Sequence, residues 1–223
     1  MAVILVYWSD IGAILVDLFS YLGDRIRGKR STGFFERPQC RLALWILVGT
    51  IVTGLMGFWL RGPIEPLFAS SLAVGLALLG TGTVLWLTSY RTAPRNHATK
   101  IGFWDAVWVG IAQAVALVPG ISRSGLTVSA GLLRGLDREL SAKFSFLLMI
   151  PATIGVLASQ WALPPGSYSL PPVIVLAGTL AAFLTGYVSL RLLLRLIQRG
   201  KFHRFAYYCW AVGAVAVIWS LIR

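Results

Sequence analysis

Acidic side chains are scarce in this chain, which has eight aspartates and glutamates against twenty lysines and arginines in 223 residues. Charged residues make up only 13% of the sequence, whereas soluble domains carry about 25%. This scarcity excludes an ordinary solvated surface. Because 57% of the residues are hydrophobic, a soluble fold of this length could not bury them all. The composition therefore predicts an integral membrane protein.

Cysteine is also rare, and its two positions exclude some chemistry. Cys40 and Cys209 lie far apart and show neither metal-binding spacing nor a redox motif, so we expect two unpaired thiols. The net charge of +12 would suggest nucleic acid in a soluble protein. Here the basic residues flank apolar segments, and no basic face or stacking platform is present. We therefore expect contact with the lipid bilayer and no binding of nucleic acid.

Five apolar segments are long enough to cross a bilayer, which takes about 20 residues. They are Leu42–Leu60, Leu67–Tyr90, Phe144–Leu163, Val173–Leu190 and Phe205–Ile222. The third contains Pro151, where we expect a kink. Ala2–Leu22 carries Asp10 and Asp17 on one helical face, which predicts the end of a span that runs into an amphipathic interfacial helix. The sequence thus predicts an all-α polytopic membrane protein with five to six transmembrane helices in one integral domain, residues 1–223.

One further apolar segment, Ile101–Leu136, is interrupted at Pro119-Gly120, and each half of about 16 residues is short for a span. Basic residues gather on both sides of the segment: Arg91, Arg95 and Lys100 before it, and Arg134, Arg138 and Lys143 after it. By the positive-inside rule both flanking loops lie on the inner side, so the segment crosses an even number of times. This predicts a re-entrant helical hairpin over about residues 101–136.

The predicted tip of the hairpin carries groups that suit a phosphate. Pro119-Gly120 ends the first half-helix, and Ser122 and Ser124 can cap the second, whose free N–H groups favour an anion. The guanidinium of Arg123 matches phosphate oxygens, and Thr127 lies one turn further on. All these groups donate hydrogen bonds, and none is an acidic base. The tip therefore predicts binding and charge stabilisation of a phosphate or diphosphate.

Two structural alternatives stand beside this prediction. Arg123 could instead pair with Asp105 or with backbone carbonyls, which would make the tip only a capped turn. Gln113 could line the cavity or form a hydrogen bond between helices. An ionisable side chain at membrane depth favours the functional interpretation, because its burial is costly.

The tip segment Val118–Thr127, which reads VPGISRSGLT, resembles the second signature of the undecaprenyl-diphosphate phosphatase family, also called the bacitracin-resistance protein family. The resemblance covers essentially the whole chain. Beyond the tip it includes the approach Gly110–Gln113, the following helix Lys143–Pro151 and looser fits over Ala2–Trp8, Gly49–Leu60 and Phe205–Ile222.

The resemblance implies a function and a fold. The family hydrolyses undecaprenyl diphosphate to the monophosphate, which recycles the lipid carrier for peptidoglycan synthesis and gives bacitracin resistance. It implies a multi-pass protein of the bacterial inner membrane with inverted repeats, a divalent cation (Mg²⁺ or Ca²⁺) and a possible homodimer. By match of motif, Arg123, Ser122 and Ser124 would be catalytic. The substrate-binding set would be Pro119, Gly120, Ser122, Arg123, Ser124, Thr127 and Gln113.

One departure from the family pattern is serious. The family's glutamate-rich first signature, which supplies the metal ligands and a histidine, is absent, and Ala2–Trp8 resembles the end of the helix that follows it. We therefore expect that the N-terminal part of the family domain is missing, that this chain offers no metal ligands, and that by itself it is weak or inactive. The alternative to a missing segment is a degenerate homologue of the family. The alternative functions are those of a non-catalytic polyprenyl-phosphate binding protein and of a small transporter.

Overall fold

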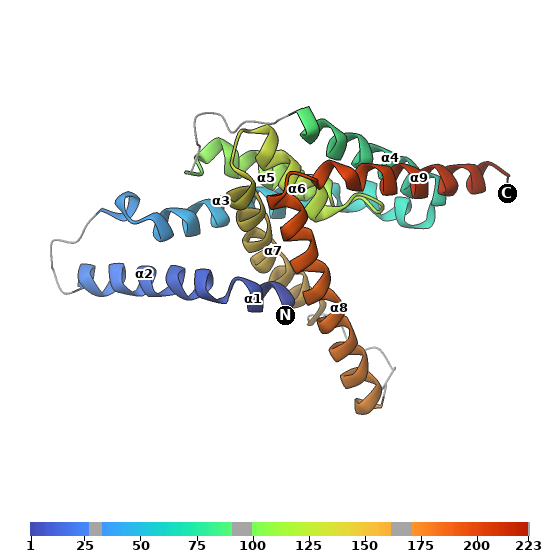
Figure 1. The fold of residues 1–223 in the computed structure, drawn as a ribbon. Helices are drawn as coiled ribbons and strands as arrows, with labels where there is room; N and C mark the ends of the chain where they lie inside the picture. The colour runs from blue at the N-terminus through green and yellow to red at the C-terminus, as the bar shows by residue number, and fades with distance from the viewer. Residues whose placement is uncertain (27–32, 91–99, 162–170, 223) are drawn as a thin grey trace.

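The computed structural model describes residues 1–26, 33–90, 100–161 and 171–222, and every regular element within these ranges is helical (Figure 1). The α-helices are α1 (Ala2–Val6), α2 (Trp8–Ile26), α3 (Pro38–Ile64), α4 (Ser71–Leu87), α5 (Phe103–Val115), α6 (Arg123–Leu133), α7 (Arg138–Trp161), α8 (Pro172–Gln198) and α9 (Phe205–Ile222). Two of the basic residues used for the inside–outside assignment, Arg91 and Arg95, lie outside the described ranges.

Five helical segments are long and apolar enough to cross a membrane, and each contains or overlaps one predicted span. They are Pro38–Ala69, Ser71–Tyr90, Arg138–Ala158, Val173–Gln198 and Phe202–Ile222. The all-α polytopic fold is therefore confirmed. The first spanning helix, α3, begins at Pro38, four residues before the predicted span at Leu42. Proline fits the first turn of a helix, because a backbone N–H there has no helical partner. Pro151 lies inside α7, which continues through it, and the predicted end at Leu163 lies beyond the described residues.

The N-terminal segment divides at Tyr7 into two helices, α1 and α2. Tyr7 leaves the helical region with φ −106° and ψ 23°. Asp10, near the start of α2, forms an ion pair with Lys143 of α7. Asp24, near the end of α2, pairs with Arg37 at 2.8 Å, just before α3 begins. Both aspartates therefore tie α2 to neighbouring helices.

Glycines let the helices around the hairpin approach closely. A Cβ atom added to Gly110 of α5 would lie 2.8 Å from the carbonyl oxygen of Gly49 in α3. A Cβ atom on Gly75 of α4 would lie 3.1 Å from the carbonyl oxygen of Gly213 in α9. Small residues at such crossings allow backbone-to-backbone packing in membranes. The first half-helix of the hairpin therefore lies directly against α3, and α4 lies directly against α9.

Helices α5 and α6, with 13 and 11 residues, form a helical hairpin within the segment predicted to be re-entrant. They are shorter than expected because the turn between them takes up residues 116–122. Arg134, just past the end of α6, donates from Nε to Oδ1 of Asp105 in the first turn of α5 at 2.9 Å. The outer ends of the two half-helices thus lie together.

Candidate functional site

The tip of the hairpin is a tight turn that only glycine fits at its centre. The N–H of Ile121 donates to the carbonyl of Val118 at 3.2 Å, which closes the turn. Gly120 has φ +91°, in the left-handed region that side chains other than glycine rarely adopt. A Cβ atom there would lie 2.4 Å from the carbonyl oxygen of Val74 in α4. The tip therefore packs directly on the backbone of α4.

The second half-helix begins with a side-chain cap. Ser122 has extended backbone angles, and its Oγ accepts a hydrogen bond from the N–H of Gly125 at 3.1 Å. This confirms the predicted cap. Ser124 does not share that role, because it is the second residue of α6 and the cap position is taken by Ser122. One of the two serines proposed as caps is therefore inside the helix.

A threonine that the sequence did not single out holds the start of α6. The N–H of Ser122 donates to Oγ1 of Thr81 in α4 at 3.3 Å. Thr81 is 2% exposed, and its own hydroxyl donates to the carbonyl of Ala77 at 3.0 Å. No sequence pattern identifies this contact, because threonines in spanning helices usually bond only to a carbonyl of the preceding turn. Its partner is found only when α4 and the hairpin are placed together.

Arg123 has no protein partner in the part of the chain that the structure describes. Its side chain is partly exposed, and its guanidinium makes no hydrogen bond or ion pair there. Asp105, the alternative partner, is occupied by Arg134 and by the N–H of Gly102. The backbone N–H groups of Arg123 and Ser124 are likewise unpaired among the described residues. The start of α6 thus combines an arginine and two backbone donors that are free to meet an anion.

Thr127 and Gln113, for which the sequence suggests places on a cavity at the tip, are both buried. Thr127 is 1% exposed, and its hydroxyl donates to the carbonyl of Arg123 at 2.8 Å. Gln113 is fully buried, and its Nε2 donates to Oγ1 of Thr53 in α3 at 3.3 Å. The interhelical hydrogen bond, one of two alternatives for Gln113, is therefore present. Its Oε1 atom has no partner in the described structure.

Thr53 is a second contact that sequence reasoning missed. Its hydroxyl lies 2.8 Å from the carbonyl oxygen of Gly49 and 3.0 Å from that of Gly110 in α5. It also accepts the hydrogen bond from Gln113. Threonines of two different spanning helices thus hold the two half-helices, Thr53 for α5 and Thr81 for α6.

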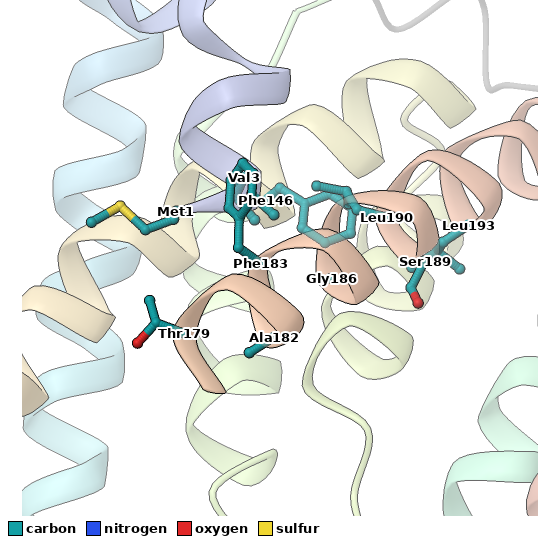
Figure 2. A pocket seen from close by; sticks show the side chains of 11 residues that line it. Met1, Val3, Phe146, Thr179, Ala182, Phe183, Gly186, Ser189, Leu190 and Leu193 are labelled. Atoms are coloured by element: carbon teal, nitrogen blue, oxygen red, sulfur yellow. The ribbon is translucent and has the colours of Figure 1, made fainter. Parts of the chain in front are cut away.

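Two cavities lie away from the tip. The larger, of about 610 Å³, is an apolar groove lined by α1, α7 and α8, with Val3, Phe146 and Phe183 among its side chains (Figure 2). The smaller, of about 160 Å³, surrounds the Asp10–Lys143 pair. Burial and then the nearby carboxylates raise the pKa of the Tyr7 phenol in its wall, so this group stays neutral. Neither cavity includes a residue of the hairpin turn.

The tip does not fit a divalent cation. Its polar groups are an arginine, hydroxyls and backbone N–H groups, whereas Mg²⁺ and Ca²⁺ take oxygen ligands that include carboxylates. Across the described ranges, no three histidine, cysteine, aspartate or glutamate side chains come together as possible metal ligands. The chemistry available at the tip is that of an anion site.

Fold and site together define a multi-pass α-helical membrane protein that carries a half-helix hairpin with an unpaired arginine at its tip. The family of the bacitracin resistance protein BacA matches residues 1–215 of the chain. This chain therefore belongs to that family. The match includes the hairpin and all five long apolar helices except the last residues of α9.

Curated relatives cover nearly the same region. A protein of Desulforapulum autotrophicum named undecaprenyl-diphosphatase is 38% identical over 224 residues, which is 97% of this chain and 79% of the relative. A protein of Desulfosudis oleivorans with the same name is 39% identical over 100% of this chain and 81% of its own length. A third, from Methanothermobacter thermautotrophicus, is 41% identical over 79% of this chain and 99% of its own length.

Proposed function

We propose that this protein is an undecaprenyl-diphosphatase of the bacterial inner membrane. It hydrolyses undecaprenyl diphosphate to undecaprenyl phosphate and phosphate, which returns the lipid carrier to cell-wall synthesis and gives resistance to bacitracin. The observation that carries this proposal is the unpaired Arg123 at the capped start of α6, in a chain whose relatives bear that name. The proposal also includes a homodimer.

In this proposal the start of α6 binds the diphosphate. The guanidinium of Arg123 pairs with phosphate oxygens, and the free N–H groups of Arg123 and Ser124 donate to the same anion at the positive end of the helix dipole. The hydroxyls of Ser122 and Ser124 add further donors. Pro119 and Gly120 hold the turn that lets the phosphate approach the backbone. As charge grows on the phosphoryl oxygens in the transition state, these donors stabilise it.

Thr127 and Gln113 belong to the proposed binding set through the positions they fix. Thr127 donates to the carbonyl of Arg123 and so fixes the first turn of α6. Gln113 links α5 to Thr53 of α3. A direct donor role for either side chain requires that it leave its present partner. Their contact with substrate remains a prediction.

Hydrolysis needs groups that the tip does not provide. A water molecule must lose a proton as it attacks phosphorus, and the hydrogen-bond partners of the tip among the described residues include no carboxylate or imidazole to accept it. The Mg²⁺ or Ca²⁺ that the family resemblance implies likewise has no ligands there. We therefore assign only the anion-binding half of the chemistry to the hairpin tip, and we derive no step through the cation.

The test is phosphate release from a C15 or C55 prenyl diphosphate in detergent with Mg²⁺ or Ca²⁺. It should be run on this chain and on the chain with a family N-terminal segment fused before Met1. We expect robust hydrolysis by the fusion and a loss of about 100-fold or more in Arg123→Ala, the loss typical for removal of one main charge-stabilising donor. Arg191→Ala is the matched control, because Arg191 is exposed on α8 and lies over Tyr187.

Three outcomes separate the alternatives. Wild-type turnover in Arg123→Ala would remove Arg123 from the mechanism. Binding of prenyl diphosphate that depends on Arg123 but releases no phosphate, in the chain and in the fusion, would identify a non-hydrolysing polyprenyl-phosphate binding protein. Robust hydrolysis by the unfused chain would show that the glutamate-rich signature is dispensable.

A further inference from the structure

One face of α4 lies along the hairpin tip and the start of α6. Its members recur every three or four positions, which places them on one helical stripe. The stripe consists of Val74, Ala77, Thr81 and Leu85. Gly120 lies against the first two, since a Cβ atom there would be 2.4 Å from the Val74 carbonyl oxygen and 3.1 Å from the Ala77 Cβ atom. Gly125 lies against the last, at 3.7 Å from Leu85 Cδ2 by the same measure.

Thr81 is the polar member of this stripe, and its hydroxyl has a fixed direction. The proton goes to the carbonyl of Ala77 at 3.0 Å, so an oxygen lone pair is left for the N–H of Ser122 at 3.3 Å. Thr81 is 2% exposed, so its own hydroxyl is shielded from water, whereas the N–H of Ser122 is only part-buried. Loss of the hydroxyl would remove the protein partner of this N–H, which has a cost in stability.

This bond selects which donors remain free at the start of α6. Thr81 satisfies the N–H of Ser122, and Ser122 Oγ satisfies the N–H of Gly125. The N–H groups of Arg123 and Ser124 lie between these two and stay unpaired in the described structure. The two bonds therefore hold the first turn of α6 in the one orientation that presents these donors and the arginine.

We propose that Thr81 is a positioning residue for the phosphate site, acting through Ser122 on the orientation of Arg123. This inference rests on the proposed function for its kinetic consequence. Its structural consequence, protection of the Ser122 amide, does not depend on activity. Thr81 touches no substrate in this role.

The experiment compares Thr81→Val, which keeps shape but removes the hydroxyl, with Thr81→Ser, which keeps the hydroxyl. All variants are made in the same purified protein, with the family N-terminal segment fused before Met1, and tested with a C15 prenyl diphosphate. We expect kcat of Thr81→Val to fall about tenfold, because the start of α6 loses the bond that orients it, with little change in KM. Thr81→Ser should recover most of the rate. Hydrogen exchange at the Ser122 amide should be faster in Thr81→Val than in wild type.

Thr83→Val is the matched control. Thr83 lies on the same helix and makes the same bond to a preceding carbonyl, that of Leu79 at 3.0 Å, but it is exposed. Its hydroxyl also accepts from Nε1 of Trp210 in α9 at 3.4 Å, so its interhelical bond goes to α9 and not to the hairpin. It should keep wild-type kcat and exchange. In an Arg123→Lys background, Thr81→Val should cost less than in wild type, because both changes act on one group.

The outcomes are distinguishable. An active wild type with equal kcat and equal Ser122 exchange in Thr81→Val would overturn the positioning role. An equal loss in Thr81→Val and Thr81→Ser would also overturn it, since the hydroxyl would then be irrelevant. Suppose that the wild type is inert toward prenyl diphosphates, while exchange at the Ser122 amide is still faster in Thr81→Val. This result would contradict the proposed function and would limit the role of Thr81 to holding the start of α6.

Discussion

The two half-helices of the hairpin have similar lengths, yet they bring opposite ends to the tip. Helix α5 arrives with its carbonyl end, is mostly apolar, and is held along its length by Gly110 and Gln113 against α3. Helix α6 begins at the tip with its N–H end and is rich in hydroxyls; Thr81 holds its start, and Gly131 packs closely on Ser141 of α7 further along. Only an N–H end attracts an anion. This difference supports the proposal that α6 is the binding element and α5 its support.

The largest expected effect comes from the glycine that joins the two half-helices. Gly120→Ala would place a Cβ atom 2.4 Å from the Val74 carbonyl oxygen and would strain a backbone with φ +91°. We expect the free energy of unfolding to fall by about 3 kcal/mol or more, because both strain and overlap act on fixed backbone. Thermal unfolding in detergent measures this loss of stability.

Gly54→Ala provides the control for this change, since Gly54 in α3 is exposed and a Cβ atom there meets nothing within 4 Å. It should be neutral or slightly stabilising, as alanine favours helix over glycine by roughly 0.5–1 kcal/mol. Equal melting temperatures for the two variants would show that the tip does not pack on α4 as described.

A middle-sized effect tests the claim that α6 is the binding element. Ser122→Ala removes the cap that accepts from Gly125 and should lower stability by about 1 kcal/mol. Hydrolysis of prenyl diphosphate should fall further than stability alone explains, because the free donors of α6 lose their orientation. Ser122→Thr should restore most of both, since threonine also caps helices. A rate unchanged in Ser122→Ala would make α6 no more important than α5.

The smallest effect is expected where the two half-helices meet at their outer ends. Arg134→Gln removes the ion pair with Asp105, in which the arginine side chain is 39% exposed. Exposed pairs contribute about 0–1 kcal/mol, so the melting temperature should move little and the rate should stay near wild type. Asp105→Ala should cost more, because Asp105 also accepts from the N–H of Gly102 at the start of α5. The reverse order would show that the ion pair, not the cap, holds the hairpin closed.

Much of the fold could be predicted from the sequence, because apolar length and basic loops are strong local signals. The five spans and the hairpin over residues 101–136 follow from them, and so does the cap at Ser122. The ends of the helices are predicted less accurately, because the turn of the hairpin takes up residues that periodicity assigns to the two half-helices. The start of α3 also lies earlier than apolar length alone indicates.

The threonine contacts could not be predicted. Thr53 and Thr81 look like ordinary threonines of spanning helices, and their partners lie 57 and 41 residues away in the chain. The depth of Thr127 and Gln113 was also hidden, because helical spacing tells which face a residue shares but not what covers that face. The sequence left Asp105 as a possible partner of Arg123, and only the structure shows that Asp105 pairs with Arg134 instead.

The order of the anchors along the chain bears on how the protein is made. Neither half-helix can lie in lipid alone, because both end at a break whose backbone polar groups need protein partners. The two helices that supply Thr53 and Thr81, α3 and α4, are synthesised before the hairpin. The contacts with Thr53 and Thr81 can therefore form as soon as the hairpin is synthesised, whereas the packing of α6 on α7 has to wait for α7.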